Sequence, residues 1–185
     1  MIHKKAIYYA DDDIESVGIL LRLRVPVLII GLILGTLISF FMSQFEEVLE
    51  QDIRLAFFLP FVVYIAAALG AQTESIYAGG LKVRKAKFHN YLVKESFIGF
   101  FIGLGFGLIS GLAVWWWMES FEMGMAIGLS MFAALLIAPI TGLLTTQASQ
   151  YLHEDPSVES GPIVAVIQDV LTVVIYGNIC SLILL

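Results

Sequence analysis

Five long apolar segments alternate with short polar segments along the chain. A helix that crosses a hydrocarbon core of roughly 30 Å needs about 20 largely apolar residues, and each segment is long enough. The pattern therefore predicts an all-α integral membrane protein, a bundle of five transmembrane helices preceded by a polar N-terminal segment, residues 1–24. The expected membrane domain, residues 25–185, contains the spans Val25–Phe45, Leu55–Gly80, Phe97–Trp117, Met123–Leu152 and Val158–Leu185.

The positions of Lys and Arg predict the orientation of these spans. Of the ten Lys and Arg residues, only Arg54 lies in a segment that follows the first or the third span. All the others precede the first span or lie between the second span and the start of the third. Because cytoplasmic loops are enriched in Lys and Arg, the N-terminus is expected in the cytoplasm and, after five spans, the C-terminus outside. The expected location is the plasma or inner membrane.

Composition supports a membrane protein and excludes several other classes. The chain of 185 residues is 59% hydrophobic and only 14% charged, whereas soluble domains carry about a quarter charged residues. A net charge of −6 argues against nucleic acid as a partner, and one cysteine with three histidines excludes a disulfide framework and a structural zinc site. No catalytic triad, phosphate-binding loop or dinucleotide motif occurs, so neither an enzyme nor an organic cofactor is expected.

Two carboxylates interrupt the apolar segments. Ionisable side chains are costly in lipid and usually face a bundle interior or a water-filled path. Asp169 lies within the fifth span, on one helical stripe with Thr172. It is either a functional carboxylate or a structural group that bonds a neighbouring helix. Glu74, near the end of the second span, either faces a path or extends to the headgroups. Gln72 lies two residues away and therefore on another face, unless the helix breaks near Gly79-Gly80.

The chemistry of these side chains favours a hard divalent cation. Carboxylate, amide and hydroxyl oxygens suit Mg2+, Ca2+ or Mn2+. Because one carboxylate per chain neutralises a divalent ion poorly, a homodimer that brings two copies of Asp169 together is the simplest arrangement. The loop before the fifth span carries acidic residues and no Lys or Arg, so it is either a short loop without consequence or an acidic mouth that concentrates cations. The candidate ligands are Asp169, Gln72, Thr172, Glu74 and, from this loop, Asp155.

Glycines in the third span recur every four residues, at positions 99, 103, 107 and 111. Small residues at this spacing let helix backbones approach closely, so they are interpreted as packing sites. The pair Gly31 and Gly35 in the first span has the same interpretation. The acidic residues at 46, 47, 50 and 52 form either a solvated loop or an outer acidic vestibule.

From about Arg22 to Leu185 the chain resembles the transmembrane domain of the MgtE magnesium channel and transporter family. The most specific stretch is Asp155-Pro156-x-x-x-Ser160-Gly161-Pro162, followed by Asp169-Val170-Leu171 and Ile175-Tyr176. It is similar to the family pattern DPxxxSGP…DVLGLxIY. Further resemblances are Arg22 with Pro26, Phe45-Glu46-Glu47, Lys94-Glu95 with Gly99, and Pro60, Gly70, Gln72, Gly80 and Leu81 in the second span.

The resemblance implies a homodimer with its pore at the subunit interface, lined by the second and fifth spans. Asp169 would be the pore carboxylate that holds a largely hydrated Mg2+. The chain departs from the family pattern where Ala68 replaces a pore Asn, Gly79 an Arg and Ala165 a hydroxyl residue, and where Tyr64, Ala66 and Ala67 replace glycines. Larger members carry cytoplasmic Mg2+-sensing domains that close the pore. Here either a separate regulatory subunit supplies such control or the pore is gated without it.

Three functions follow as hypotheses. The favoured one is transport of hydrated divalent cations, most of all Mg2+, across the cell membrane. The second is exchange coupled to Na+ or H+, with Glu74 as an additional titrating group. The third is a membrane scaffold subunit that conducts no ion, in which Asp169 only joins helices.

Overall fold

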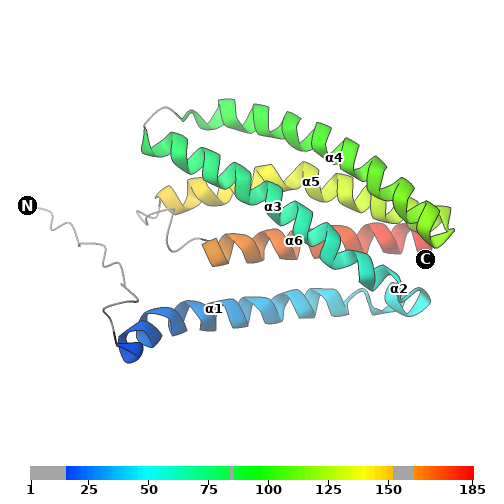
Figure 1. Cartoon of the computed structure of the whole chain (residues 1–185), viewed down its shortest axis with the longest axis horizontal. Helices are drawn as coiled ribbons and strands as arrows, with labels where there is room; N and C mark the ends of the chain where they lie inside the picture. The colour runs from blue at the N-terminus through cyan, green and yellow to red at the C-terminus, as the bar shows by residue number, and fades with distance from the viewer. Residues whose placement is uncertain (1–15, 84–85, 152–160) are drawn as a thin grey trace, which may run out of the picture.

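The computed structural model describes residues 16–83, 86–151 and 161–185, and every regular element in these ranges is a helix (Figure 1). Long apolar runs form helices because in lipid the backbone polar groups must bond within the segment. The helices are α1 (Val17–Ser43), α2 (Glu46–Gln51), α3 (Leu55–Lys82), α4 (Phe88–Met118), α5 (Phe121–Tyr151) and α6 (Gly161–Leu184).

Four of the helices are long and apolar enough to cross a membrane, namely α3, α4, α5 and the part of α6 from Ala165 to Leu184. They lie where the second to fifth spans were predicted. In α1 the apolar helical stretch Leu28–Ser43 is shorter. The helix α4 begins at Phe88, well before the predicted Phe97, because helical hydrogen bonds continue through residues too polar to count as apolar span. The short helix α2 was not predicted.

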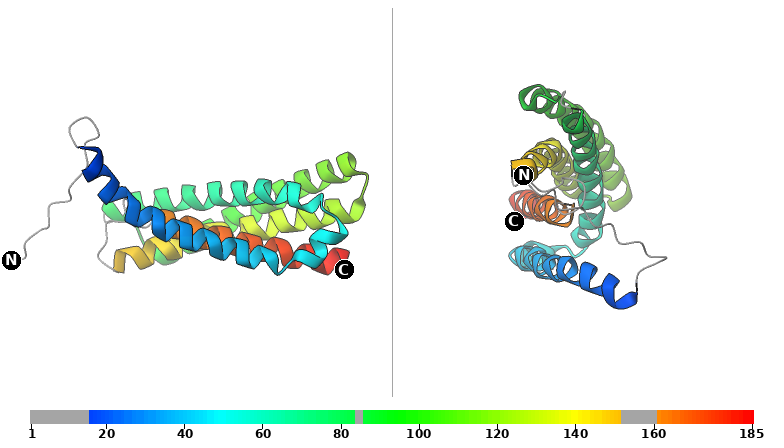
Figure 2. Two further views of the ribbon diagram at one scale, coloured as in Figure 1. Left: turned by 90° about the horizontal axis from the view of Figure 1, so that it is seen from below. Right: turned by 90° about the vertical axis from the view of Figure 1, so that its left-hand side faces the viewer.

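The helix α5 occupies the centre of the bundle. In the most apolar 18-residue stretch of α5, 61% of the residues are buried, whereas the corresponding stretches of α3, α4 and α6 are 28% to 33% buried. It packs against α4, α3 and α6. The helices α4 and α1 lie at opposite edges of the arrangement, and α1 packs chiefly against α6 (Figures 1 and 2). Seen along the bundle in Figure 2, the helices form a curved layer with α3 against α5 and α6.

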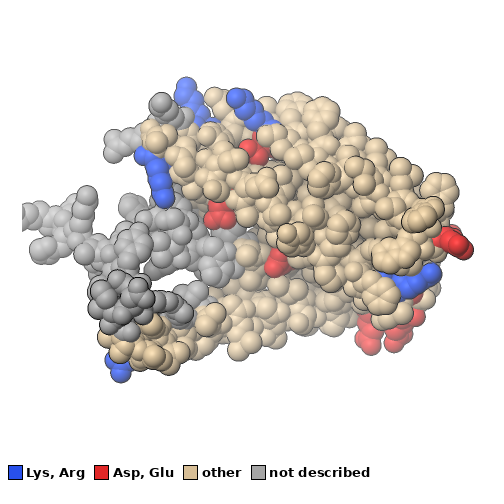
Figure 3. Space-filling view, in the orientation of Figure 1, with Lys and Arg blue, Asp and Glu red and all other residues tan. Residues whose placement is uncertain are grey.

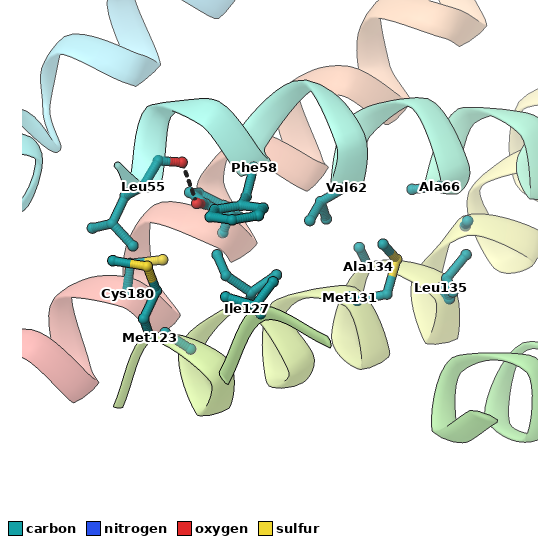
Figure 4. Close-up of a cluster of buried hydrophobic side chains, with 14 of the residues drawn as sticks. Leu55, Phe58, Val62, Ala66, Met123, Ile127, Met131, Ala134, Leu135 and Cys180 are labelled. Atoms are coloured by element: carbon teal, nitrogen blue, oxygen red, sulfur yellow. Dashed lines mark hydrogen bonds between the residues drawn. The ribbon is translucent and has the colours of Figure 1, made fainter. Parts of the chain in front are cut away.

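The hydrophobic core forms where α3 lies against α5 (Figure 4). Its α3 residues recur at helical spacing, so they lie on one face of the helix. They are opposed by buried residues of α5 and by Cys180 of α6. The labelled members are Leu55, Phe58, Val62 and Ala66 from α3, and Met123, Ile127, Met131, Ala134 and Leu135 from α5.

Glycines bring α4 and α5 into backbone contact, as the four-residue spacing predicted. A Cβ atom added at Gly99, Gly103, Gly107 or Gly111 would lie 2.7 to 2.9 Å from a carbonyl oxygen of α5. The close approach is reciprocal, because a Cβ at Gly128 of α5 would lie 2.8 Å from the carbonyl oxygen of Gly107. The packing interpretation of the α4 glycines is therefore confirmed.

The turn between α4 and α5 consists of two residues. Glu119 adopts a left-handed conformation, with φ 53° and ψ 26°, at the C-terminal end of α4. The hydroxyl oxygen of Ser120 accepts a hydrogen bond from the Met123 backbone N–H at 3.2 Å. This satisfies one of the free N–H groups at the start of α5. The two most closely packed helices are thus joined by the shortest connection between long helices.

Phe45, which lies between α1 and α2, packs against α6. Its ring lies on the backbone of Gly177, so close that a Cβ at position 177 would be 2.3 Å from ring atoms. Within α1, a Cβ added at Gly31 or Gly35 would meet nothing within 4 Å. The packing interpretation of these two glycines is not confirmed, because no described part of the chain approaches them that closely.

Candidate functional site

Asp169 lies half-buried in the apolar helix α6. The side of α6 that faces α3 and α5 consists of residues spaced by three or four positions, so it forms one stripe along the helix. The buried stripe comprises Gln168, Thr172, Val173, Tyr176 and Cys180. Asp169 lies on this side of the helix too, three residues before Thr172 and four before Val173, but its side chain is only half-buried. The carboxylate therefore lies on the packed side of α6, at a place that the neighbouring helices cover only in part.

Thr172 lies on the same side of α6 as Asp169, three residues further along the helix. Its side chain is only 1% exposed, and its hydroxyl donates to the Gln168 backbone carbonyl at 2.9 Å. The carboxylate and the hydroxyl therefore share one stripe, but only the hydroxyl is fully buried. Thr172 stabilises the helix locally in this arrangement.

Gln168 fills the junction of three helices. It is 4% exposed, and its amide nitrogen donates to the Thr172 hydroxyl at 3.3 Å. Its carboxamide oxygen faces α3 at Gly70, where a Cβ would lie 3.5 Å from that oxygen and 3.4 Å from the carbonyl oxygen of Ala138 in α5. A Cβ at Gly142 of α5 would in turn lie 2.6 Å from the Gly70 carbonyl oxygen. Helices α3, α5 and α6 therefore meet within one helical turn of Asp169.

The polar residues of α3 divide between its sides. Gln72 is exposed and Glu74 is partly buried, while Thr73 between them is buried and donates its hydroxyl to a carboxylate oxygen of Glu95 in α4 at 2.8 Å. The helix continues unbroken through Gly79 and Gly80, so the alternative of a local break there is wrong. As expected for an unbroken helix, Gln72 and Glu74 lie on different faces.

Sequence reasoning did not identify Glu95 and Gln168 as buried polar groups. Glu95 was named only as part of the family resemblance and precedes the predicted span Phe97–Trp117, but the early start of α4 places it inside the helix, with Thr73 opposite. Gln168 is an amide in an apolar run next to Asp169, a signal that a search for buried amides would have found. Both are buried because of residues distant in sequence, which a local pattern does not show.

The two ends of the bundle carry different charges (Figure 3). We call the end where α3 finishes and α1 and α4 begin the basic end, and the end around α2 and the α4–α5 turn the acidic end. Between them the described residues visible in Figure 3 are uncharged apart from isolated acidic groups. The described residues at the basic end include Arg22, Lys82, Lys87 and Lys94, and those at the acidic end Glu46, Glu47, Glu50, Glu119 and Glu122.

Asp52 and Arg54 form an ion pair at the acidic end, outside the membrane-spanning segments. The Arg54 guanidinium lies 2.6 Å from a carboxylate oxygen of Asp52. The hydrogen bond from this side chain is the largest effect and lowers the pKa of Asp52 below its usual value. Partial burial opposes it, while the Arg54 backbone N–H and the charge of Arg54 add smaller effects in the lowering direction. This pair fixes the connection between α2 and α3.

Within the described residues, the candidate ligands do not form a closed metal site. In the described ranges no three His, Cys, Asp or Glu side chains gather closely enough to hold a metal ion. Asp155, the fifth candidate ligand, lies outside the described residues. Asp169, Gln72, Glu74 and Thr172 occupy two helices that contact each other, α3 and α6. An ion bound by such groups would keep most of its water or take ligands from a second copy of the chain.

Helix lengths, apolar surfaces and an intramembrane carboxylate define a multi-span helical membrane protein. The family model described as MgtE, a divalent cation transporter, matches residues 59–179, which extend from α3 into α6. The chain therefore belongs to the MgtE family, a family of transporters rather than enzymes.

Curated relatives named magnesium transporter MgtE align with most of this chain. The protein from Enterococcus faecalis is 29% identical over 162 residues, that from Bacillus subtilis 27% over 161 residues, and that from Thermus thermophilus 26% over 164 residues. The alignments cover 85% to 87% of this chain but 36% of each relative. The chain thus spans little more than a third of the length of these relatives.

Proposed function

We propose that two copies of this chain form a path for hydrated divalent cations, most of all Mg2+, across the cell membrane. Asp169 serves as the pore carboxylate. The observation that carries the proposal is its position, half-buried within the apolar helix α6, in a chain that the MgtE family model matches through this helix. Because an intramembrane carboxylate is costly in lipid, it is retained where it faces water or an ion.

The proposed assembly has five spans per chain, with α1 as the first. The basic end faces the cytoplasm, since Lys and Arg are retained there, and the acidic end faces outside. Helices α3 and α6 of each copy line the path, so that two copies of Asp169 approach each other across the subunit interface. Two carboxylates neutralise a divalent ion, and Mg2+ that keeps its water needs only such oxygen acceptors around it.

The remaining candidate ligands act as outer oxygen groups along this path. Gln72 is exposed on α3 and Glu74 partly so, and both lie closer to the basic end than the middle of that helix. Asp155 belongs to the proposed cytoplasmic mouth. Acidic groups at a mouth raise the local concentration of cations and so speed their entry.

The test is divalent-cation flux into vesicles that contain the purified protein. Asp169→Ala and Asp169→Asn are expected to lower Mg2+ flux at least about tenfold, because supporting groups of a metal site have effects of this order and the ligand itself no less. The matched control is Glu122→Ala, an exposed carboxylate at the acidic end, which should leave flux unchanged. Both Asp169 variants should remain folded.

Three outcomes would contradict the proposal or a part of it. Wild-type protein that is folded and passes no divalent cation under any gradient would favour a non-conducting scaffold, in which Asp169 only joins helices. Flux that is unchanged in Asp169→Ala would remove this residue from the path. A mass corresponding to one chain in detergent and in vesicles would contradict the dimer.

A coupled exchanger is the second candidate, favoured by the partly buried Glu74 next to the Thr73–Glu95 pair. In that case flux would depend on a Na+ or proton gradient, and Glu74→Gln would abolish the dependence. Flux that ignores both gradients would exclude it.

A further inference from the structure

Gln168 carries a buried carboxamide oxygen that has no hydrogen-bond partner in the described part of the chain. The side chain is 96% buried, since its exposed fraction is 4%. Buried polar atoms are nearly always hydrogen-bonded, and one left unpaired weakens the folded state. A leucine or methionine would fill a similar volume without this cost. The amide therefore calls for an explanation other than stability.

The carboxamide is held in one orientation. Its nitrogen donates to the hydroxyl of Thr172, and that hydroxyl donates in turn to the Gln168 backbone carbonyl. The oxygen is thereby turned toward Gly70 of α3, and it lies 3.5 Å from where a Cβ atom of residue 70 would be. The fit depends on glycine at position 70 and on the close approach of Gly142 from α5, which holds α3 in place.

Gln168 also determines where Asp169 lies. Successive residues of an α-helix differ by about 100° around the axis, so fixing Gln168 against α3 fixes the direction of Asp169. A second contact with α3 lies further along the same buried stripe, where the Tyr176 hydroxyl donates to the Leu55 carbonyl oxygen at 2.6 Å (Figure 4). The packing of Gln168 against Gly70 and this hydrogen bond together define the rotation of α6 relative to α3.

We propose that Gln168 is a positioning residue for cation passage, whose buried carboxamide sets the rotation of α6 against Gly70 and thereby directs Asp169 into the path. Buried polar groups of this kind specify one arrangement of helices at some cost in stability. The inference rests on the proposed function, in which Asp169 is the pore carboxylate. It adds that the residue before Asp169 determines how well that carboxylate meets the ion.

The decisive variant is Gln168→Met, which keeps the length of the side chain and removes both polar atoms. Methionine is flexible and packs in several ways, so it fills the junction without fixing a rotation. The variant is expected to be at least as thermally stable as the wild type, because the unpaired oxygen is gone. Its apparent KM for Mg2+ is nevertheless expected to rise roughly tenfold, the order found when groups that orient a metal ligand are removed.

The matched control is Asn178→Met. Asn178 is an amide on the exposed side of the same helix, and its side chain donates only to the Val174 backbone carbonyl at 2.7 Å. Its replacement should change neither the apparent KM nor the ratio of Mg2+ to Mn2+ flux. A structural role for Gln168 would instead lower stability and the flux of all ions together, with KM and the ion ratio unchanged, and would overturn the proposal.

A second measurement reports the direction of residue 169 without flux. In an Asp169→Cys protein, the rate of labelling by a charged thiosulfonate reagent measures access from water, while buried Cys180 gives the background. Adding Gln168→Met should change this rate several-fold, and adding Asn178→Met should not. An unchanged rate would overturn the positioning role even if wild-type flux is confirmed. Absent wild-type flux with a changed labelling rate would contradict the proposed function alone.

Discussion

Glycines at four-residue spacing occur in both α1 and α4, but they lie in opposite surroundings. In α4, Gly107 and Gly111 touch the backbone of α5, where Gly124 and Gly128 complete the contact. In α1, a Cβ added at Gly31 or Gly35 would meet nothing within 4 Å in the described part of the chain. The comparison teaches that the spacing permits close packing without producing it, because a second helix must also lie directly against the glycines.

The largest expected effect comes from filling these glycine sites. Gly128→Val is expected to lower the free energy of unfolding by about 3 kcal/mol, since a Cβ would lie 2.8 Å from the Gly107 carbonyl oxygen and backbone cannot yield as a side chain can. The matched variant Gly31→Val should change it by no more than about 0.5 kcal/mol. Denaturant unfolding in detergent micelles measures both. Equal losses in the two variants would break the comparison.

A smaller effect is expected where α1 and α2 are attached to α6. In Gly177→Ala the new methyl group displaces the ring of Phe45, at an expected cost of about 1 to 2 kcal/mol, because a side chain moves more easily than backbone. Phe45→Ala removes the obstacle, so adding Gly177→Ala to it should cost almost nothing further. This double-mutant cycle isolates the Phe45–Gly177 contact. Additive losses would show that another contact anchors α1.

The smallest effect concerns the ion pair between α2 and α3. The Arg54 side chain lowers the pKa of Asp52 in the folded protein, so the pair stabilises the fold above the unfolded pKa of about 4. This contribution is lost as the pH falls through the lower folded value. Both side chains are partly exposed, which keeps the effect small. The free energy of unfolding should fall slightly less between about pH 6 and about pH 3 in Asp52→Asn than in the wild type. An identical difference would show that the pair contributes nothing.

The helices α3, α5 and α6 were predictable because an apolar run in lipid must form a helix, so hydrophobicity alone defines their extent within a few residues. Hydrophobicity does not show where a helix extends into water, which is why the start of α4 at Phe88 and the helix α2 were missed. The sequence of a helix also does not show which helix packs against it. Gly31 and Gly107 both belong to glycines at four-residue spacing, but only Gly107 lies against another described helix.

The candidate site was predictable only where one residue is conspicuous by itself. Asp169 is such a residue, because a carboxylate within an apolar run is costly wherever the helix packs. The full burial of Thr172 beside the half-buried Asp169 depends on the helices that pack against α6, which a helical stripe drawn from sequence does not show. The surroundings of Gln168 depend on Gly70 and Gly142, which come from other helices.

The two-residue turn at Glu119 and Ser120 makes the most extensive helix contact also the most local in the chain. Contacts between neighbours in sequence close small loops and form early in folding. We therefore expect the α4–α5 hairpin to assemble as a unit during synthesis. The contact between α1 and α6 has the opposite history, because α1 precedes the other helices and must wait until α6 leaves the ribosome. At the edge formed by α4, helices made one after the other are expected to pack together at once. At the edge formed by α1, the first helix to be made is expected to pack last.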